Sequence, residues 1–299
     1  MLAFETWDVF TESPFAGNPL AIVRGADALS VAQMQTLARE FNLSETLFVM
    51  APRDPARTAR VRIFFPTAEI PFAGHPTLGC AIALSGLAAP GPDAEVTLVL
   101  EEEAGLVPVC VRRRANRVEG TFAAPVLPFA APGRADPALT AAALGVATLG
   151  TVGHPAPSLW QGGPAFLYVP LPDLATLAAA GPVQPHWSRL MHEAGVDSAW
   201  CYTRTAQGYR ARMFSPTAGI PEDPATGSAS AIFAAELMAR GLLGAGETRI
   251  AIAQGIEMGR PSTIGLTAVV ENGALAAVRV TGSAVPIAQG RIAVPQVAG

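Results

Sequence analysis

The sequence RIFFPTAEIP at residues 62–71 has a near copy, RMFSPTAGIP, at residues 212–221. Each copy leads through a turn into a helix rich in small residues, predicted over residues 75–84 in the first case and 224–240 in the second. The spacing is about half of the 299-residue chain. Such a spacing is typical of a duplicated domain and is too long for a solenoid repeat.

Working outward from the repeats, each half is predicted to be mostly β. A helix is expected at residues 30–41, where Ser30 and Gln33 form a capping box, and another around residues 187–194. The expected strands of the first half are residues 3–10, 19–24, 46–51, 60–65, 95–100, 106–111 and 117–122. Those of the second half are residues 165–170, 199–203, 209–214, 248–253, 263–270, 274–281 and 291–294.

Small side chains on each repeat helix allow strands to approach it closely, so each helix is expected inside a curled sheet. The predicted fold class is α+β, with two similar barrel-like β domains each wrapped around a central helix. The predicted halves are residues 1–124 and 125–284, with residues 285–299 as a candidate final strand of the first half. The Pro/Ala-rich residues 123–137 are the expected linker.

Composition excludes several classes of protein. The net charge is −4, with 24 acidic and 20 basic residues, which argues against nucleic acid as a partner. The basic run 112–114 is interpreted as a solvated strand end, with a binding patch as the alternative. The chain contains no lysine. Schiff-base catalysis, pyridoxal-phosphate attachment and a Walker A lysine are therefore excluded.

The cysteines and the apolar segments predict neither a metal site nor a membrane span. Cys80, Cys110 and Cys201 are widely spaced and are interpreted as reduced core residues, and no CxxC or His/Cys cluster predicts zinc. The first residues lack the pattern of a signal peptide. The uncharged residues 137–172 are interrupted by Pro and Gly, so no membrane helix is predicted. We expect a cytoplasmic protein.

Both repeats reach their helix through a polar residue followed by proline, His75-Pro76 and Asp223-Pro224. Proline favours the first helical position, which predicts His75 and Asp223 as N-caps. Exposed N–H groups at a helix start bind anions, and in a duplicated fold the two starts can face each other across the cleft between the halves. Capping alone can explain Asp223, whereas His75 is a poorer cap and is a candidate for catalysis or ligand contact.

Glu45 is the third candidate, because it enters an apolar strand. It is either an exposed residue at the strand end or a carboxylate facing a partly dry pocket. In a pocket, desolvation would raise its pKa and let it exchange protons near neutral pH.

Motifs along most of the chain resemble the PhzF-like (phenazine biosynthesis) family. They are DVFT at residues 8–11, FAGNP at 15–19, NLSET at 42–46, FAGHPTLG at 72–79, EDPATGSA at 222–229, QG at 254–255 and GRPS at 259–262. The part least similar to the family is residues 123–160.

This resemblance implies a diaminopimelate-epimerase-like fold in a homodimer, without a metal or organic cofactor. It implies a proton transfer by a glutamate, assisted by a histidine and an aspartate, at the positions of Glu45, His75 and Asp223. The small-molecule carboxylate substrate would be held by five further residues, Asn18, Ser44, Gly74, Gly227 and Ser228.

One departure within the fold bears on the reaction. Racemases and epimerases of this architecture use two cysteines, one at the mouth of each helix, and this chain has no thiol there. A two-base inversion is therefore disfavoured, and an isomerase that moves a proton on one face is favoured. A binding protein without turnover and an epimerase with an unexpected base pair remain alternatives. The sequence contains neither the GxSxG motif of many hydrolases nor the phosphate loop of nucleotide-binding proteins, so these two functions are disfavoured.

Overall fold

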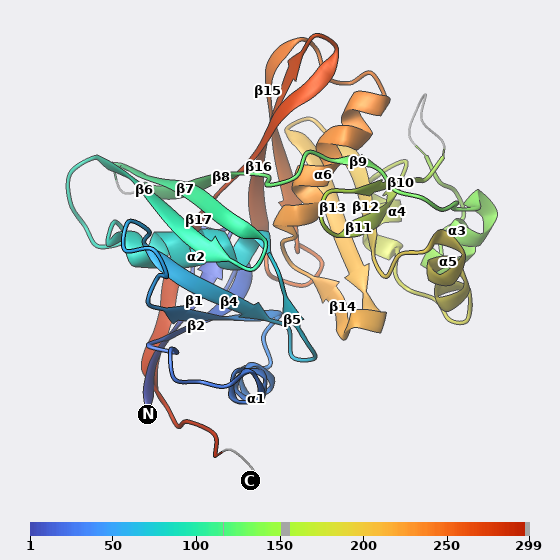
Figure 1. The fold of residues 1–299 in the computed structure, drawn as a ribbon. Coiled ribbons are helices and arrows are strands. Elements are labelled where there is room, and N and C mark those ends of the chain that lie inside the picture. The colour runs from blue at the N-terminus through green and yellow to red at the C-terminus, as the bar shows by residue number, and fades with distance from the viewer. Residues whose placement is uncertain (116, 151–155, 297–299) are drawn as a thin grey trace. The chain divides into compact units, whose positions relative to one another are not determined.

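The structure is a computed structural model that describes residues 1–115, 117–150 and 156–296. The chain divides into two compact units (Figure 1). The first unit comprises Met1–Ala123 and Thr281–Gly299, and the second comprises Ala124–Val280. The candidate final strand at residues 285–299 therefore falls in the first unit, although its last three residues lie outside the described part of the chain.

The strands of the first unit form a closed ring. Hydrogen-bonded pairs connect β1 to β2, β3, β4, β6, β7, β8 and β17 in that order, and β17 pairs with β1 again. These strands are β1 (Leu2–Val9), β2 (Asn18–Arg24), β3 (Glu45–Met50), β4 (Ala59–Phe64), β6 (Ala94–Glu102), β7 (Gly105–Arg114), β8 (Arg117–Ala123) and β17 (Ala274–Ile292). The short β5 (Glu69–Ile70) pairs with β4.

Helix α2 (Gly74–Ser85) is the central helix of the first unit. It contacts β1, β2, β3, β6, β7 and β8 (Figure 1). Every residue from Gly74 to Ile82 is buried. Gly79 permits the close approach, because a Cβ atom at this position would lie 2.6 Å from Val9 Cγ2 and 2.8 Å from Leu20 Cδ2. The predicted helix inside a curled sheet is present here.

Helix α1 (Val31–Phe41) covers another part of the first unit. Its predicted capping box is confirmed: Ser30 accepts a hydrogen bond from the Gln33 backbone, and the Gln33 side chain accepts one from the Ser30 backbone. The apolar face of α1 packs against Phe48 and Phe64, whose rings meet edge to face.

The second unit repeats the plan of strands around a helix. Its strands pair in the order β9, β10, β11, β12, β13, β15 and β16, with β14 on β13. They are β9 (Phe129–Ala130), β10 (Ser158–Gln161), β11 (Ala165–Pro170), β12 (Ala199–Thr205), β13 (Gly208–Ser215), β14 (Ile220–Asp223), β15 (Gly246–Gln254) and β16 (Ser262–Glu271). Helix α6 (Gly227–Ala239) contacts β9, β10, β11 and β16. A 3₁₀ turn, η1 (Pro216–Ala218), precedes β14.

Helix α6 is fixed by an aromatic cluster and by a buried carboxylate. Phe233 on α6 packs against the rings of Tyr168, Trp200, Tyr202 and Tyr209. One turn further on, Glu236 is 1% exposed and accepts hydrogen bonds from four side chains, those of Ser158, Trp160, Tyr202 and Arg240. A buried charge with this many donors is compensated in the folded state.

A second core lies beside the strands of this unit. Helices α3 (Pro137–Leu144), α4 (Leu174–Ala179) and α5 (His186–Ala194) pack around the fully buried Trp187. Of these three helices, only α5 was predicted from the sequence. Asp136 caps α3 with Pro137 in its first turn, a signal that the linker interpretation passed over.

The fold class is the predicted one, with two differences in detail. The strands predicted at residues 274–281 and 291–294 are one continuous strand, β17. Pro286 lies within this strand at a register shift opposite Trp7, where proline is tolerated in a sheet. Arg113 is not solvated as predicted for the run 112–114: it is buried and donates to the carbonyls of Leu87, Ala89 and Pro92.

Candidate active site

The N-cap of α2 lies two residues earlier than the sequence predicted. The N-cap is Ala73, so His75 is the second helical residue and Pro76 the third. The first four N–H groups of a helix have no acceptor within it, so proline is tolerated throughout the first turn and does not fix the first position. The prediction of His75 as the N-cap is therefore wrong.

His75 contacts Glu45 within the first unit. Its Nδ1 lies 3.4 Å from Glu45 Oε2, and the two residues are 3% and 8% exposed. Of the two interpretations of Glu45, the exposed strand end does not hold, because this residue is buried at the first position of β3. Burial lowers the pKa of His75 to about 3, although a hydrogen bond with the Pro19 backbone opposes this shift. The imidazole is therefore neutral at pH 7, and the contact is not an ion pair.

The other ring nitrogen of His75, Nε2, does not take part in the contact with Glu45. Nε2 is buried and has no hydrogen-bond partner among the described residues. A buried polar atom left in this state costs about 1–3 kcal/mol. A small polar ligand at this position would remove that cost.

The substrate-binding candidates of the first unit lie on neighbouring elements. Asn18 is the fully buried first residue of β2, Ser44 is half-buried and precedes β3, and Gly74 is the buried first residue of α2. β2 and β3 are parallel, with Leu20 opposite Glu45. Ser44 directly precedes Glu45 in the chain, and Gly74 directly precedes His75. Asn18 lies two residues before Leu20, the residue that pairs with Glu45.

The loop before Asn18 has a fixed shape. Asp8 Oδ2 accepts a hydrogen bond of 2.7 Å from the Phe15 backbone N–H. Gly17 has φ +67°, and a Cβ there would lie 2.3 Å from the Val9 carbonyl oxygen. Only glycine fits this backbone, so the loop presents Asn18 in one position.

A second buried acid, which the sequence analysis did not single out, lies near the first turn of α2. Glu102 is the last residue of β6 and is 8% exposed. Its Oε1 lies 2.7 Å from Thr77 Oγ1, while Oε2 is buried without a hydrogen-bond partner in the described residues. Thr77 Oγ1 also lies 2.7 Å from the Ala73 carbonyl oxygen. Because a hydroxyl has a single hydrogen, Thr77 can donate to only one of these two oxygens at a time. Burial raises the pKa of Glu102 to about 8, so this group holds a proton at pH 7.

In the second unit, the start of α6 also differs from the prediction. The N-cap is Thr226, and Asp223 is the last residue of β14, three residues before it. Gly227 and Ser228 are the first two helical residues, the former buried and the latter half-buried. The Asp223-Pro224 pair thus lies before the helix, and its proline does not mark the first helical position.

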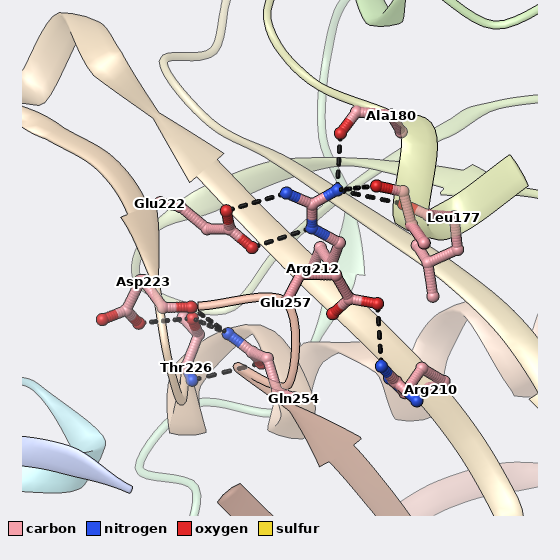
Figure 2. Close-up of polar contacts among 10 residues, drawn as sticks. Leu177, Ala180, Arg210, Arg212, Glu222, Asp223, Thr226, Gln254 and Glu257 are labelled. Atoms are coloured by element: carbon pink, nitrogen blue, oxygen red, sulfur yellow. Dashed lines mark hydrogen bonds and ion pairs between the residues drawn. The ribbon is translucent and has the colours of Figure 1, made fainter. Parts of the chain in front are cut away.

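Asp223 is held by side chains from two further elements (Figure 2). The Thr226 hydroxyl donates to Asp223 Oδ2 over 2.5 Å. Gln254, the last residue of β15, donates from Nε2 to Thr226 Oγ1 and to the Asp223 carbonyl. Thr226 and Gln254 lie within motifs of the sequence, but no role of their side chains was predicted.

The residue next to Asp223 is fixed by a bidentate ion pair. Glu222 binds Arg212 through two contacts of 2.8 Å, and the Arg212 Nη1 atom donates to the carbonyls of Leu177, Ala178 and Ala180 (Figure 2). The first unit has a counterpart, because Arg62 in the first repeat binds Glu69 through two contacts of 2.6 Å. Each repeat arginine thus ties its strand to the segment that leads to the helix.

The cysteines and possible metal ligands add no further site. Cys80, Cys110 and Cys201 are free, and burial raises the pKa of all three thiols. Within the described residues, no three His, Cys, Asp or Glu side chains are grouped as metal ligands would be. The helices in this part of the chain include none with the length and apolar character needed to cross a membrane.

A β unit that surrounds a small-residue helix, occurring twice in one chain with polar groups at both helix starts, defines the diaminopimelate epimerase-like class of fold. Residues 7–290 match the family described as phenazine biosynthesis-like protein. The chain belongs to this phenazine biosynthesis-like (PhzC-PhzF) family.

Individual relatives agree with this assignment. An uncharacterized isomerase of Mesorhizobium japonicum is 41% identical over 298 residues, covering 96% of this chain and 97% of that protein. A trans-2,3-dihydro-3-hydroxyanthranilate isomerase of Pseudomonas chlororaphis is 36% identical over 286 residues, covering 95% and 97%. The crystal structure of a PhzF-family phenazine biosynthesis protein of Bacillus anthracis has a TM-score of 0.86 and 24% identity, covering 98% of this chain and 99% of that chain.

Proposed function

We propose that this protein is a cofactor-independent isomerase that moves a proton within a small unsaturated carboxylic or amino acid. The reaction is of the dihydro-hydroxyanthranilate isomerase type, and relatives with 36% and 41% identity are named isomerases. The observation that carries the proposal is the buried contact between Glu45 and His75. A carboxyl group and a neutral imidazole in one dry site are suited to proton transfer to and from carbon.

In the proposed mechanism Glu45 is the general acid and base. Its carboxylate takes a proton from a saturated carbon beside the double bond and becomes a carboxylic acid. The double bond shifts, and the same proton returns to another carbon on the same face, so Glu45 ends in its starting state. His75 Nδ1 orients the Glu45 carboxyl group, while the unpartnered Nε2 is available to a polar group of the substrate.

The remaining candidates bind and orient the substrate. Asp223 interacts with its amino or hydroxyl group. The N–H groups at the two helix starts bind its carboxylate, with Gly74 in one unit and Gly227 and Ser228 in the other. Asn18 and Ser44 complete the contacts. These roles and the absence of a cofactor are proposals, as are the cytoplasmic location and the homodimer, the last of which sedimentation equilibrium would test.

The test follows the reaction by NMR in D₂O, with dihydro-hydroxyanthranilate as the substrate. Glu45→Gln removes the proton acceptor and keeps the shape, so we expect turnover to fall by about 10²- to 10⁴-fold or more. Glu40→Gln is the matched control, because it makes the same change on the exposed face of α1 and should turn over like the parent.

Each outcome has a distinct meaning. Isomerisation by the parent and by Glu40→Gln, but not by Glu45→Gln, would support both the reaction class and the catalytic residue. Full activity of Glu45→Gln would refute the mechanism. An inactive parent would favour a binding protein or another substrate, and inversion at carbon with solvent deuterium would favour an epimerase.

A further inference from the structure

The second unit contains a buried chain of hydrogen bonds that ends on Asp223 (Figure 2). Trp200 Nε1 donates to Gln254 Oε1 over 3.3 Å, and the Thr226 backbone N–H donates to the same oxygen over 3.3 Å. Gln254 Nε2 donates to Thr226 Oγ1 over 2.9 Å and to the Asp223 carbonyl over 2.8 Å. Trp200 and Gln254 are fully buried, and Thr226 and Asp223 are nearly so.

The direction of these hydrogen bonds is fixed by chemistry. An indole N–H and a backbone N–H can only donate, so the Gln254 group that faces them must be its oxygen. Its NH₂ group therefore faces Thr226 and donates to the hydroxyl oxygen. Since Thr226 Oγ1 already accepts from Gln254, its single hydrogen points to Asp223 Oδ2.

We propose that Thr226 and Gln254 are positioning residues that hold the Asp223 carboxylate in one orientation for the substrate. A hydrogen bond donated to a charged oxygen favours the ionised form and fixes its rotamer. This inference rests on the proposed function, in which Asp223 contacts the substrate.

Thr226 donates to Asp223 Oδ2 beside two arginines that bind other carboxylates. On β13, Arg212 is engaged by Glu222, and Arg210 donates to Glu257 over 2.8 Å (Figure 2). These two arginines are therefore already committed to carboxylates other than Asp223. Arg260 follows in the same turn as Glu257, and its backbone carbonyl approaches Gly255.

The first measurement is the kcat/KM of Thr226→Val and Thr226→Ser. Val has nearly the shape of Thr but cannot donate, so kcat/KM should fall about 10- to 100-fold, the value of a hydrogen bond to a charged group. Ser keeps the hydroxyl and should restore most of the activity. Thr140→Val is the matched control, because Thr140 is a fully buried threonine of α3 in the same unit. Parent-like activity of Thr226→Val would overturn the inference.

A double-mutant cycle separates positioning from general damage to the fold. If Thr226 acts through Asp223, Thr226→Val should cause no further loss in an Asp223→Asn background. A further loss equal to that in the parent background would show that Thr226 acts only on the structure, and the inference would fail. Gln254→Leu should behave like Thr226→Val in the same cycle.

A readout without turnover distinguishes failure of this inference from failure of the proposed function. The carbon-13 titration of the Asp223 carboxyl should move to higher pH in Thr226→Val and stay near the parent curve in Thr226→Ser. This shift would support the inference even if the parent had no isomerase activity. An unshifted curve in Thr226→Val would overturn it even if the isomerase activity were established.

Discussion

Two buried glutamates of this chain have opposite surroundings. Glu236 accepts hydrogen bonds from four side chains, including Arg240, so its negative charge is compensated. Glu102 contacts only the Thr77 hydroxyl through Oε1, and its Oε2 has no partner within the described residues. The first site suits a carboxylate, and the second suits a neutral carboxylic acid.

The state of Glu102 predicts a pH dependence of stability. Burial raises its pKa from 4.5 to about 8, so between these values the folded chain holds a proton that the unfolded chain releases. Stability from this group is fully present below pH 4.5 and is lost as pH rises through about 8, by an amount on the order of a few kcal/mol. Glu102→Gln keeps an uncharged group of the same shape. The unfolding free energy of this variant, measured by denaturant titration, should vary less between about pH 5 and pH 9 than that of the parent. This pH range spans most of the interval between the two pKa values.

Glu40→Gln is again the control, since it changes an exposed glutamate. Its stability should follow the parent at every pH. If Glu102→Gln showed the full pH dependence of the parent, Glu102 would be ionised in the folded protein and the assignment would be wrong.

At the residue scale, Glu45 was a candidate because it enters an apolar strand, and His75 because histidine is a poor N-cap. The structure brings these two residues into contact. The sequence did not nominate the side chains of Thr226 and Gln254. Their hydrogen bond joins residues 28 positions apart and depends on how β15 ends beside the start of α6. Such a contact depends on strand register, which composition and spacing do not reveal.

At the scale of elements, the duplication extends to matching ends of strands. β4 and β6 are parallel, with Arg60 opposite Glu101, and β13 and β15 are parallel, with Arg210 opposite Ala253. β6 ends one residue after Glu101, at Glu102, and β15 ends one residue after Ala253, at Gln254. Both side chains reach a hydroxyl at the start of a central helix, Thr77 or Thr226.

The sequence predicted these helices well in their bodies and poorly at their starts. The small-residue pattern located α2 and α6, because closely packed central helices require small side chains. The starts were misplaced because prolines in or before the first turn were taken as markers of the first position. The capping box of α1, in which two side chains act reciprocally, was the more dependable signal.

Gly79→Ala tests how closely α2 packs in the first unit. The added methyl would lie 2.6 Å from Val9 Cγ2 and 2.8 Å from Leu20 Cδ2, so these side chains or the strands that carry them would have to shift. We expect a loss of about 1–3 kcal/mol in the unfolding free energy, measured by denaturant titration. Gly181→Ala is the control, since a Cβ there meets nothing within 4 Å. Equal stability of the two variants would contradict the described packing.

For the whole molecule, β17 connects the two units along the chain. Its first part belongs to the second unit, and its residues from Thr281 onward belong to the first. There it closes the ring of strands against β1, with Leu2 opposite Ile292. A candidate final strand was predicted here, but β17 was predicted as two separate strands. A bulge that accommodates proline arises only when strands pair, so the sequence pattern does not reveal it.

Removing residues 281–299 should open this ring. The edges of β1 and β8 would then be unpaired, and we expect the cooperative thermal unfolding of the first unit to be lost, as followed by circular dichroism. A circular permutant that joins the two ends and opens the turn at Asn272–Gly273 restores every pair and should melt cooperatively. A cooperative transition at the parent temperature in the truncated chain would refute this role of β17.

The matching ends of β6 and β15 also bear on the ancestry of the two halves. Glutamine and glutamate codons differ by a single base, and a glutamic acid that keeps its proton presents one donor and one acceptor much as an amide does. After the duplication, one copy could therefore exchange Gln for Glu at this position, or the reverse, without an intermediate that buries a bare charge. Glu102→Gln would give the two halves the same side chain at this strand end, and the protonated Glu102 already offers Thr77 the hydrogen-bonding groups of an amide.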